Sequence, residues 1–105
     1  MIIEHAILDV PPERAAAYES ALHEAVPLMA ATPGFISMEV RPCLEKAGRY
    51  LLRVKWETLE AHTVNFRSSG NYKGWSALLH PFYSPFPTVE HYGDPTVNVN
   101  DAFKA

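Results

Sequence analysis

The chain has 105 residues, of which 48% are apolar, and its formal net charge at pH 7 is −3. This length and composition suit one folded domain, predicted over residues 1–105, and exclude an intrinsically disordered chain. The nine Lys and Arg residues are scattered, so the basic stripe that nucleic-acid binding needs is absent. No apolar run approaches the roughly 18 residues of a membrane span, so we expect no membrane partner.

The number of cysteines indicates the cellular compartment in which the protein works. Cys43 is the only cysteine, so no internal disulfide can form, which fits a reducing compartment. The residues after Met1 enter a strand-like pattern without a basic leader or a long apolar stretch, so no signal peptide is visible. We therefore expect a cytoplasmic location. Cys43 follows Pro42 in a predicted turn without an activating neighbour in sequence, and we interpret it as an inert thiol.

The first part of the chain predicts a strand and then a helix. Residues 2–10 are apolar enough for a strand covered on both faces, interrupted by Glu4 and His5. Pro11-Pro12-Glu13 suits a helix start, because proline is tolerated in the first turn and an acidic side chain favours the positive end of the helix dipole. We expect Pro27, late in this helix, to kink or shorten it. The helix carries one apolar face at helical spacing: Tyr18, Ala21, Leu22, Ala25 and Met29.

Two further strands are predicted to pair as an antiparallel hairpin. Residues 35–41 alternate between apolar and polar side chains, and residues 50–56 are rich in aromatic and aliphatic ones. One face of the first of these strands should carry Ile36, Met38 and Val40. The second strand places Leu51 on one face and a larger apolar set on the other: Tyr50, Leu52, Val54 and Trp56.

The second half of the chain predicts two short helices and a last strand. Thr58 suits an N-cap, because its hydroxyl can accept an amide hydrogen of the first turn, and a helix follows over residues 59–67. Residues 68–71 interrupt it, and a second short helix, ended by Pro81, carries Tyr72, Trp75 and Leu79. A strand over residues 88–92 completes the order β-α-β-β-α-α-β. This order is an α+β, ferredoxin-like arrangement with an antiparallel sheet.

Two features of the pattern predict a homodimer. Helices of a split β-α-β sheet cover only one face, yet the predicted strands carry apolar residues on both faces, so the second face needs a cover. The tail over residues 93–105 is irregular, yet it contains Val97, Val99 and Phe103. These side chains would waste apolar surface in water, and a dimer arm packed on a partner subunit would bury them.

His62 is the residue with the most evident chemical potential. It lies one turn into a predicted helix, close to Leu59 and Phe66 at helical spacing, so it belongs on or beside the core-facing side. One interpretation is a partly buried histidine bonded to a carbonyl group. The other is a general base, which imidazole suits because its unperturbed pKa is about 6.5. Gly-rich phosphate loops, paired-cysteine zinc sites and nucleophile elbows are absent from the sequence.

Two other groups of residues allow both a structural and a functional interpretation. The aromatic and polar residues near the same helices could be plain core or the wall of a pocket for a flat ligand: Trp56, Asn65, Tyr72, Trp75, Phe82 and Tyr83. In a ferredoxin-like sheet the first and last strands pair, so His5 and His91 could become neighbours. With Glu4 and Glu90 they could hold a metal ion, but no local ligand spacing supports this, and surface histidines are the favoured interpretation. We predict no metal site.

The motifs from the third strand onward resemble the antibiotic biosynthesis monooxygenase (ABM) family of dimeric α+β-barrel proteins. The matching segments, in order, are Lys55-Trp56-Glu57, Glu60-Ala61-His62, residues 69–75 (SGNYKGW) and residues 87–92 (PTVEHY), with Thr32-Pro33-Gly34-Phe35 as a looser match. In that family the open face of the sheet is covered by the sheet of a second subunit. The family includes oxygenases, heme-degrading enzymes and members without known activity.

The resemblance implies a small monooxygenase that uses no metal, flavin or heme cofactor. Phenols, hydroquinones or anthrones would give up a proton and then an electron to dioxygen in a dry pocket. By this resemblance His62 would act as base, with Asn65 or Tyr72 as hydrogen-bond partner. The implied substrate pocket comprises Trp56, Phe66, Trp75, Tyr83 and His91. The alternative is a ligand-binding or interaction protein without turnover on the same scaffold. Heme degradation fits less well, because Asn65 and Trp75 stand where that branch places a tryptophan and the heme-ligating histidine.

Overall fold

The computed structural model describes residues 1–100 of the chain, and it confirms the predicted α+β class. Four strands are present in this range: β1 (Ile2–Asp9), β2 (Phe35–Pro42), β3 (Arg49–Trp56) and β4 (Val89–Tyr92). The two α-helices are α1 (Ala15–Ala30) and α2 (Gly70–Leu79). Three short helices complete the order: η1 (Pro12–Arg14), η2 (Ala61–Phe66) and η3 (His80–Phe82). The order of strands and main helices is the ferredoxin-like one that the sequence predicts.

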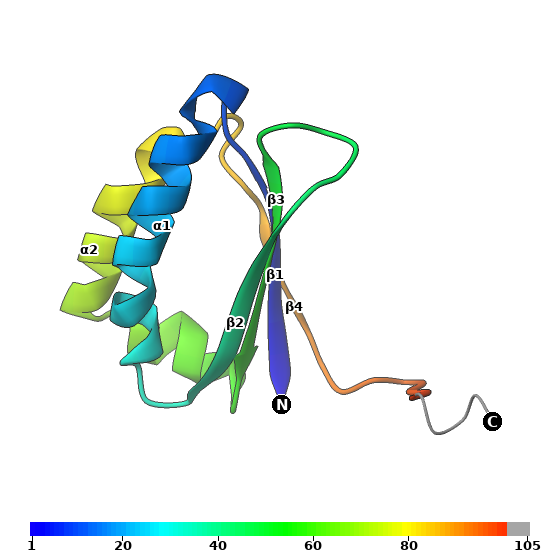
Figure 1. Cartoon of the computed structure of the whole chain (residues 1–105). Helices are drawn as coiled ribbons and strands as arrows, with labels where there is room; N and C mark the ends of the chain where they lie inside the picture. The colour runs from blue at the N-terminus through cyan, green and yellow to red at the C-terminus, as the bar shows by residue number, and fades with distance from the viewer. Residues whose placement is uncertain (101–105) are drawn as a thin grey trace.

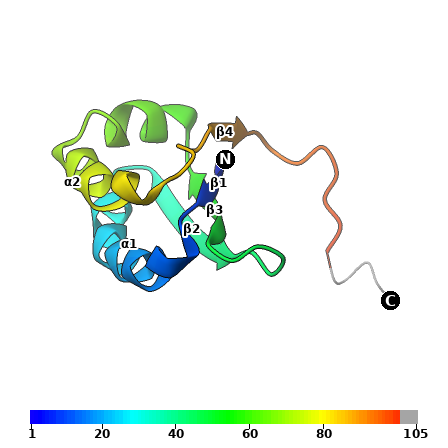
Figure 2. The ribbon, with the colours of Figure 1, turned by 90° about the horizontal axis from the view of Figure 1, so that it is seen from above.

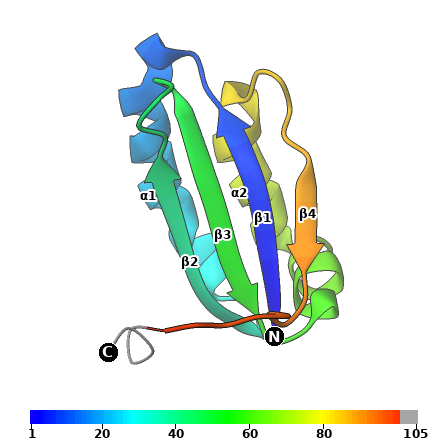
Figure 3. The ribbon, with the colours of Figure 1, turned by 90° about the vertical axis from the view of Figure 1, so that its right-hand side faces the viewer.

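The strands form one antiparallel sheet in the order β2-β3-β1-β4. The predicted β2–β3 hairpin and the predicted pairing of the first and last strands are both confirmed. Both α-helices pack on the same side of the sheet, as Figures 1 and 2 show. The other face is open, and it is turned towards the viewer in Figure 3. The positions of the side chains along each strand therefore decide which residues meet the helices.

Strand β2 contains a β-bulge that the alternating pattern does not predict. Phe35 pairs with Trp56, but Ser37 already pairs with Lys55, so Ile36 is the extra residue. Phe35 therefore packs against the core beside Trp56, with the two rings edge to face at 5.7 Å, while Ile36 is exposed. The prediction that Ile36 shares a face with Met38 and Val40 is wrong, because a bulge reverses the alternation on one side of it.

The helices differ from the prediction at two boundaries. Helix α1 runs through Pro27 to Ala30, so Pro27 does not end the helix. Helix α2 begins at Gly70, two residues before the predicted start, because Ser69 caps it by accepting a hydrogen bond from Tyr72 N at 3.1 Å. The predicted cap at Thr58 is confirmed, since its hydroxyl accepts from Ala61 N at 3.1 Å.

Segment η2 is a π-helix, which the sequence pattern does not reveal. Arg67 N donates to His62 O at 3.2 Å, a bond that spans five residues instead of the four of an α-helix. His62 and Phe66 face inward and are buried, whereas Leu59, Val64 and Asn65 are exposed. This short, wide helix therefore presents His62 and Phe66 to the space between sheet and helices.

The core lies between the sheet and the two α-helices. The predicted apolar face of α1 is confirmed, with Tyr18, Ala25 and Met29 buried and Ala21 and Leu22 packed against them. The predicted set of β3 is confirmed as well: Tyr50, Leu52, Val54 and Trp56 are all buried. Trp56 is fully enclosed, as expected from its place at the junction of strand and helix.

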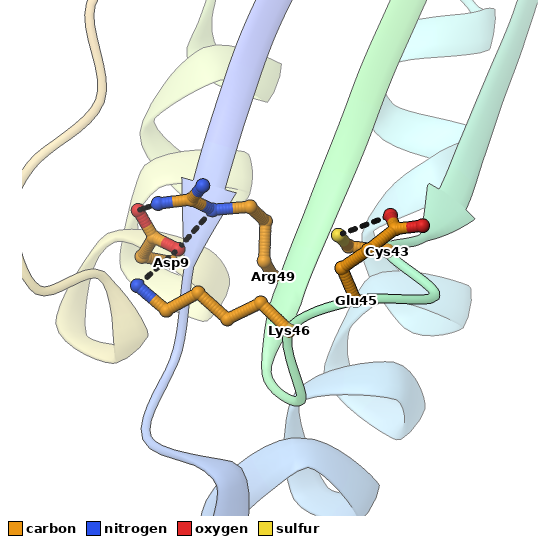
Figure 4. A network of polar contacts seen from close by, with 5 residues as sticks. All are labelled: Asp9, Cys43, Glu45, Lys46 and Arg49. Carbon is orange, nitrogen blue, oxygen red and sulfur yellow. Dashed lines mark hydrogen bonds and ion pairs between the residues drawn. The ribbon is translucent and has the colours of Figure 1, made fainter.

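A polar network holds the hairpin turn to the end of β1, as Figure 4 shows. Arg49 binds Asp9 through two hydrogen bonds of 2.8 and 3.2 Å, and Lys46 Nζ lies 3.8 Å from the same carboxylate. The bond from Arg49 holds the pKa of Asp9 below its usual value. Gly48 at φ +82° lets Val10 N donate to its carbonyl at 2.8 Å. Cys43 lies nearby, with Sγ 3.7 Å from Glu45 Oε1.

The chain after β4 leaves the sheet on the side away from α1 and α2 (Figure 1). Val97 is 78% exposed and Val99 is 58% exposed. Near the root of this segment Met1 N donates to Asp94 Oδ1 at 3.0 Å. Phe103, which is part of the predicted arm, lies outside the described residues. The dimer arm therefore stays a prediction.

Candidate functional site

A cavity of about 340 Å³ lies between the helices and the covered face of the sheet. This volume falls within the range of about 300–1,000 Å³ that is usual for small-molecule sites. Its wall draws on every strand except β2 and on both α-helices. The lining residues are Glu4, Ala6, Leu8, Met29, Leu52, His62, Phe66, Arg67, Tyr72, Trp75, His80, Tyr83, Phe86, Pro87 and Val89.

One side of the cavity is aromatic. Phe66 of η2 lies edge to face with Tyr72 at 5.3 Å and with Trp75 at 5.8 Å, both on α2. His80, at the end of α2, lies edge to face with Phe86 at 4.9 Å. Phe66 and Trp75 are buried, while Tyr72 is partly exposed. Such a wall favours a flat, apolar ligand that can stack on or lie against ring faces.

Glu4 and His62 form the polar floor of the cavity, and Trp56 and His91 bind them from behind it. Trp56 Nε1 donates to Glu4 Oε1 at 3.0 Å. His62 Nε2 lies 3.4 Å from the same Oε1, and His62 Nδ1 is 2.8 Å from His91 Nε2. Each neutral ring carries one hydrogen, so the contact between the two histidines is a single shared hydrogen bond. Glu4 and His62 are each only 3% exposed. This cluster therefore joins a buried acid to a histidine on the last strand.

Burial sets the charge state of this cluster. Desolvation raises the pKa of Glu4 above its usual value, although the bond from Trp56 and the charge of Arg67 act in the opposite direction. Desolvation, with contributions from Arg67 and His91, lowers the pKa of His62 to about 3. Desolvation lowers the pKa of His91 as well. Both histidines are therefore neutral near pH 7, and Glu4 is the acid with the unusually high proton affinity.

Two further polar groups face the cavity. Arg67 follows η2 and is exposed to solvent, and among residues 1–100 no carboxylate lies within 4 Å of its guanidinium. Tyr83 shares a hydrogen bond of 3.0 Å with the buried Tyr18, oxygen to oxygen. Burial raises the pKa of Tyr83 to about 12, so its hydroxyl stays protonated. The cavity thus combines one acid, one cation and neutral donors.

The structure brings most of the predicted site residues together. His62, Phe66, Tyr72, Trp75 and Tyr83 all line the cavity. Two other predicted pocket residues lie behind this wall. Trp56 stacks on His62 at 5.3 Å, and His91 binds His62 from the other side, but neither lines the cavity.

Asn65, the first of the two predicted hydrogen-bond partners, does not reach the cavity. It is exposed, and its side-chain nitrogen donates to Pro33 O at 3.3 Å. His62 is placed where predicted, but not as a free base. Its Nδ1 is bonded and its Nε2 is in contact with Glu4, while its lowered pKa makes it a weak proton acceptor at neutral pH.

The sequence-based prediction missed Glu4 and Arg67 as cavity residues. A faint signal was present for Glu4, since it is the acidic member of the alternating set Glu4, Ala6 and Leu8 in an otherwise apolar strand. The hypothesis of a metal site on paired strands fails geometrically, because Glu4 pairs with His91 while His5 pairs with Glu90, on the opposite face. Within residues 1–100, no group of three or more metal-binding side chains is suitably arranged.

An antiparallel ferredoxin-like sheet with helices on one face, and a small aromatic cavity between the two layers, defines a class of small α+β domains. The family model of the antibiotic biosynthesis monooxygenases matches residues 1–78. The chain belongs to this family. In the part of the chain that the structure describes, no helix has the length and apolar character needed to cross a membrane.

Several relatives share most of the chain. YczJ of Bacillus subtilis (strain 168), an uncharacterized protein, is 45% identical over 94 residues, which cover 90% of this chain and 99% of YczJ. A crystal structure from Bordetella bronchiseptica that carries the same family description is 32% identical, with a TM-score of 0.84, and the match covers 90% of this chain and 96% of that one. SnoaB, a cofactor-independent oxygenase from Streptomyces nogalater, is 18% identical with a TM-score of 0.68, covering 95% and 97% of the two chains. This last likeness concerns the fold alone.

Proposed function

We propose that this chain is a small monooxygenase that oxidises electron-rich aromatic substrates (phenols, hydroquinones or anthrones) with dioxygen and without a prosthetic group. The observation that carries the proposal is the aromatic cavity with a buried acid in its floor. Membership of the monooxygenase family supports it, as does the shared fold of SnoaB, whose name describes a cofactor-independent oxygenase. The homologue YczJ is uncharacterized and adds no substrate.

The chemistry requires the substrate to supply both the proton and the electrons. Removal of a phenolic proton leaves an electron-rich anion, which can pass an electron to dioxygen. In the anthrone case a ring CH₂ group and O₂ become a carbonyl group and water, so atoms and electrons balance without another reductant. The protein would exclude water, hold the ring against Phe66 and Trp75, and offer the hydroxyl groups of Tyr72 and Tyr83 to the developing negative charge.

The proposed acid–base groups are Glu4 and His62, which meet in the cavity floor. In this proposal His62 supports Glu4 and is not itself the base, because its ring is bonded to His91 and its pKa is low. Tyr72 keeps the predicted role of hydrogen-bond partner. Asn65 has no direct role, since its side chain binds Pro33 O on the surface.

The test follows oxygen uptake by metal-stripped, flavin-free protein with a panel of hydroquinones and anthrones. We expect uptake above the buffer rate for at least one member of the panel. We also expect a lower rate in Tyr72→Phe, which removes a hydroxyl from the cavity, and an unchanged rate in the control Asn65→Ala. Uptake no faster than buffer across the panel would contradict the proposal. Loss of activity in Asn65→Ala would contradict the assignment of the site.

A second candidate is a ligand-binding protein without turnover. The observation that favours it is that His62 is neutral, with Nδ1 bonded to His91 and Nε2 in contact with Glu4, as in a purely structural histidine. Trp75 lines the cavity, so its fluorescence should report binding in either case. Saturable quenching of Trp75 fluorescence without oxygen uptake would favour the binding protein over the oxygenase.

We also propose that the chain works as a homodimer in the cytoplasm, with the open sheet face as the interface and residues 93–100 as an arm on the partner. The open face carries Ile7, which is 41% exposed, and its cross-strand partner Leu51. Membership of a family of dimeric α+β barrels supports the interface. Sedimentation equilibrium at micromolar concentration should give twice the chain mass of 11.8 kDa. A clean monomer would contradict this proposal.

A further inference from the structure

The two oxygens of the Glu4 carboxyl group have different surroundings. Oε1 accepts the bond from Trp56 Nε1 at 3.0 Å and lies 3.4 Å from His62 Nε2. Within residues 1–100 no group donates to Oε2, and the Glu4 side chain lines the cavity. One oxygen is therefore held by the protein, while the other is free to meet a ligand.

A structural role does not account for an acid at this position. Burying a carboxyl group is costly unless it is fully hydrogen-bonded, and Glu4 is 3% exposed with one well-made bond. The Trp56 indole needs only an acceptor, which the carbonyl of a glutamine would also provide. Ala6 and Leu8, the next residues on the same face of β1, are apolar. What an acid adds here, and an amide does not, is the ability to take up a proton next to the cavity.

We infer that Glu4 is the catalytic proton acceptor of the cavity. Its Oε2 takes the proton of the phenolic hydroxyl group of a ligand. The O–H bond of the ligand breaks, an O–H bond forms on Glu4, and the electron pair stays on the ligand as a phenolate. This inference rests on the proposed function for the class of ligand. It replaces the histidine that the sequence suggests with an acid that the sequence does not single out.

The groups that face Glu4 suit this step. The titratable and charged side chains around it are His62 on η2, Arg67 just after η2, Tyr83 before β4 and His91 on β4. The two histidines are neutral, so they add no positive charge that would hold the carboxylate in its ionised form. Arg67 supplies the cation that stabilises a phenolate in the cavity. The raised pKa of Glu4 makes its ionised form a stronger base than an ordinary glutamate.

The experiment uses 4-nitrophenol, a coloured phenol that is too electron-poor to be oxidised, at a pH below its pKa in solution. Binding is followed by quenching of tryptophan fluorescence, and proton transfer by the visible absorption band of the phenolate. The full chain should produce the band on binding. Glu4→Gln, which keeps an acceptor for Trp56, should bind the probe within about threefold of the original affinity but produce no band. Glu90→Gln is the matched control, because Glu90 lies next to His91 on β4 but on the opposite face of the sheet.

A second variant covers the case in which Glu4→Gln does not fold. Glu4→Asp keeps the carboxyl group but withdraws it from the ligand, and it should reduce the band without removing it. An equal band in Glu4→Gln, or probe binding to the full chain without any band, would overturn the inference. Failure of the probe to bind would overturn both this inference and the proposed ligand class.

Turnover separates the two proposals further. With a hydroquinone that supports oxygen uptake, Glu4→Gln should lower the rate by about 10²–10⁴-fold, the usual contribution of a general base. Oxygen uptake by Glu4→Gln at the original rate would sink the assignment of Glu4 and leave the monooxygenase intact. A phenolate band in the full chain without oxygen uptake from any substrate would support Glu4 as the proton acceptor and contradict the monooxygenase.

Discussion

The charged side chains on the two faces of the sheet have opposite surroundings, exposed on the open face and buried on the covered one. On the open face Arg41 binds Glu39 at 2.5 Å, Arg53 lies 4.0 Å from the same carboxylate, and all three side chains are well exposed. On the covered face Glu4 is enclosed between Trp56 and His62. Exposed ion pairs contribute only about 0–1 kcal/mol, because water solvates both partners in any case. Water does not solvate a buried acid in this way, so the presence of Glu4 on the covered face points to function.

The largest effect should be the loss of stability on replacing Trp56, which is buried on the covered face. Trp56→Ala removes a fully buried side chain and the donor to Glu4. We expect a loss of about 3–5 kcal/mol in the free energy of unfolding, measured by urea denaturation. The control Val64→Ala, at an exposed position of η2, should stay within about 0.5 kcal/mol. An unchanged midpoint for Trp56→Ala would contradict the assigned core.

The next effect concerns the support of the buried acid. His62→Gln removes the ring between Glu4 and His91, and bonds to charged groups contribute about 1.5–3 kcal/mol. We therefore expect the rate of oxygen uptake to fall about 10–100-fold, less than in Glu4→Gln. A larger loss in His62→Gln than in Glu4→Gln would show that the histidine is the base, as the sequence suggests.

The open face provides the third test. Ile7→Lys places a charge in the middle of the proposed interface, and in a symmetric dimer each substitution counts twice. We expect the dissociation constant of the dimer to rise at least about tenfold in sedimentation experiments. Leu44→Lys, at a 94% exposed position in the hairpin turn, is the control and should leave the dimer unchanged. Equal association of both variants would place the interface elsewhere.

The smallest effect should be the pH dependence of stability. The pKa of His62 falls from an ordinary value of about 6.5 to about 3 in the folded chain. The folded state binds this proton less readily than the unfolded state, so the contribution of His62 is complete above pH 6.5 and is lost as the pH falls towards 3. Glu4, with its raised pKa, acts in the opposite direction, because its contribution is lost as the pH rises through its folded pKa.

The contribution of His62 can be isolated by comparing the full chain with His62→Gln. The difference between their denaturation midpoints should shrink as the pH is lowered from 6.5 to 3. A difference that is constant with pH would contradict the buried, neutral histidine.

Periodicity predicts α1 and β3 well, because each of them contributes a long, regular run. The face of α1 and the set of residues buried on β3 follow from spacing alone. The bulge at Ile36 does not follow, since it exists only relative to the partner strand β3. The hairpin was predictable from its short turn, and the pairing of the first and last strands from the ferredoxin-like order of the elements.

The site was only partly predictable, and the reasons are local. In the π-helix η2 each residue rotates less about the axis than in an α-helix, so Asn65 turns away from the face that His62 and Phe66 share. Glu4 was hidden because β1 has apolar residues on both faces, so the sequence does not show which face the helices cover. Phe66 and Trp75 were easier to predict, because they are buried whether they serve as core or as the wall of a pocket.

The cavity has a practical consequence for the search for its ligand. Its wall combines residues of β1, β3 and β4 with residues of both α-helices, so the unfolded chain has no equivalent site. A molecule that binds only the folded state raises stability by mass action, by about 2.7 kcal/mol when its concentration is 100 times its dissociation constant. Thermal-shift screening of an aromatic compound library can therefore rank ligands without an assay for turnover. Compounds that stabilise the full chain but not a cavity-filling variant such as Ala6→Phe would be the ones to test with oxygen.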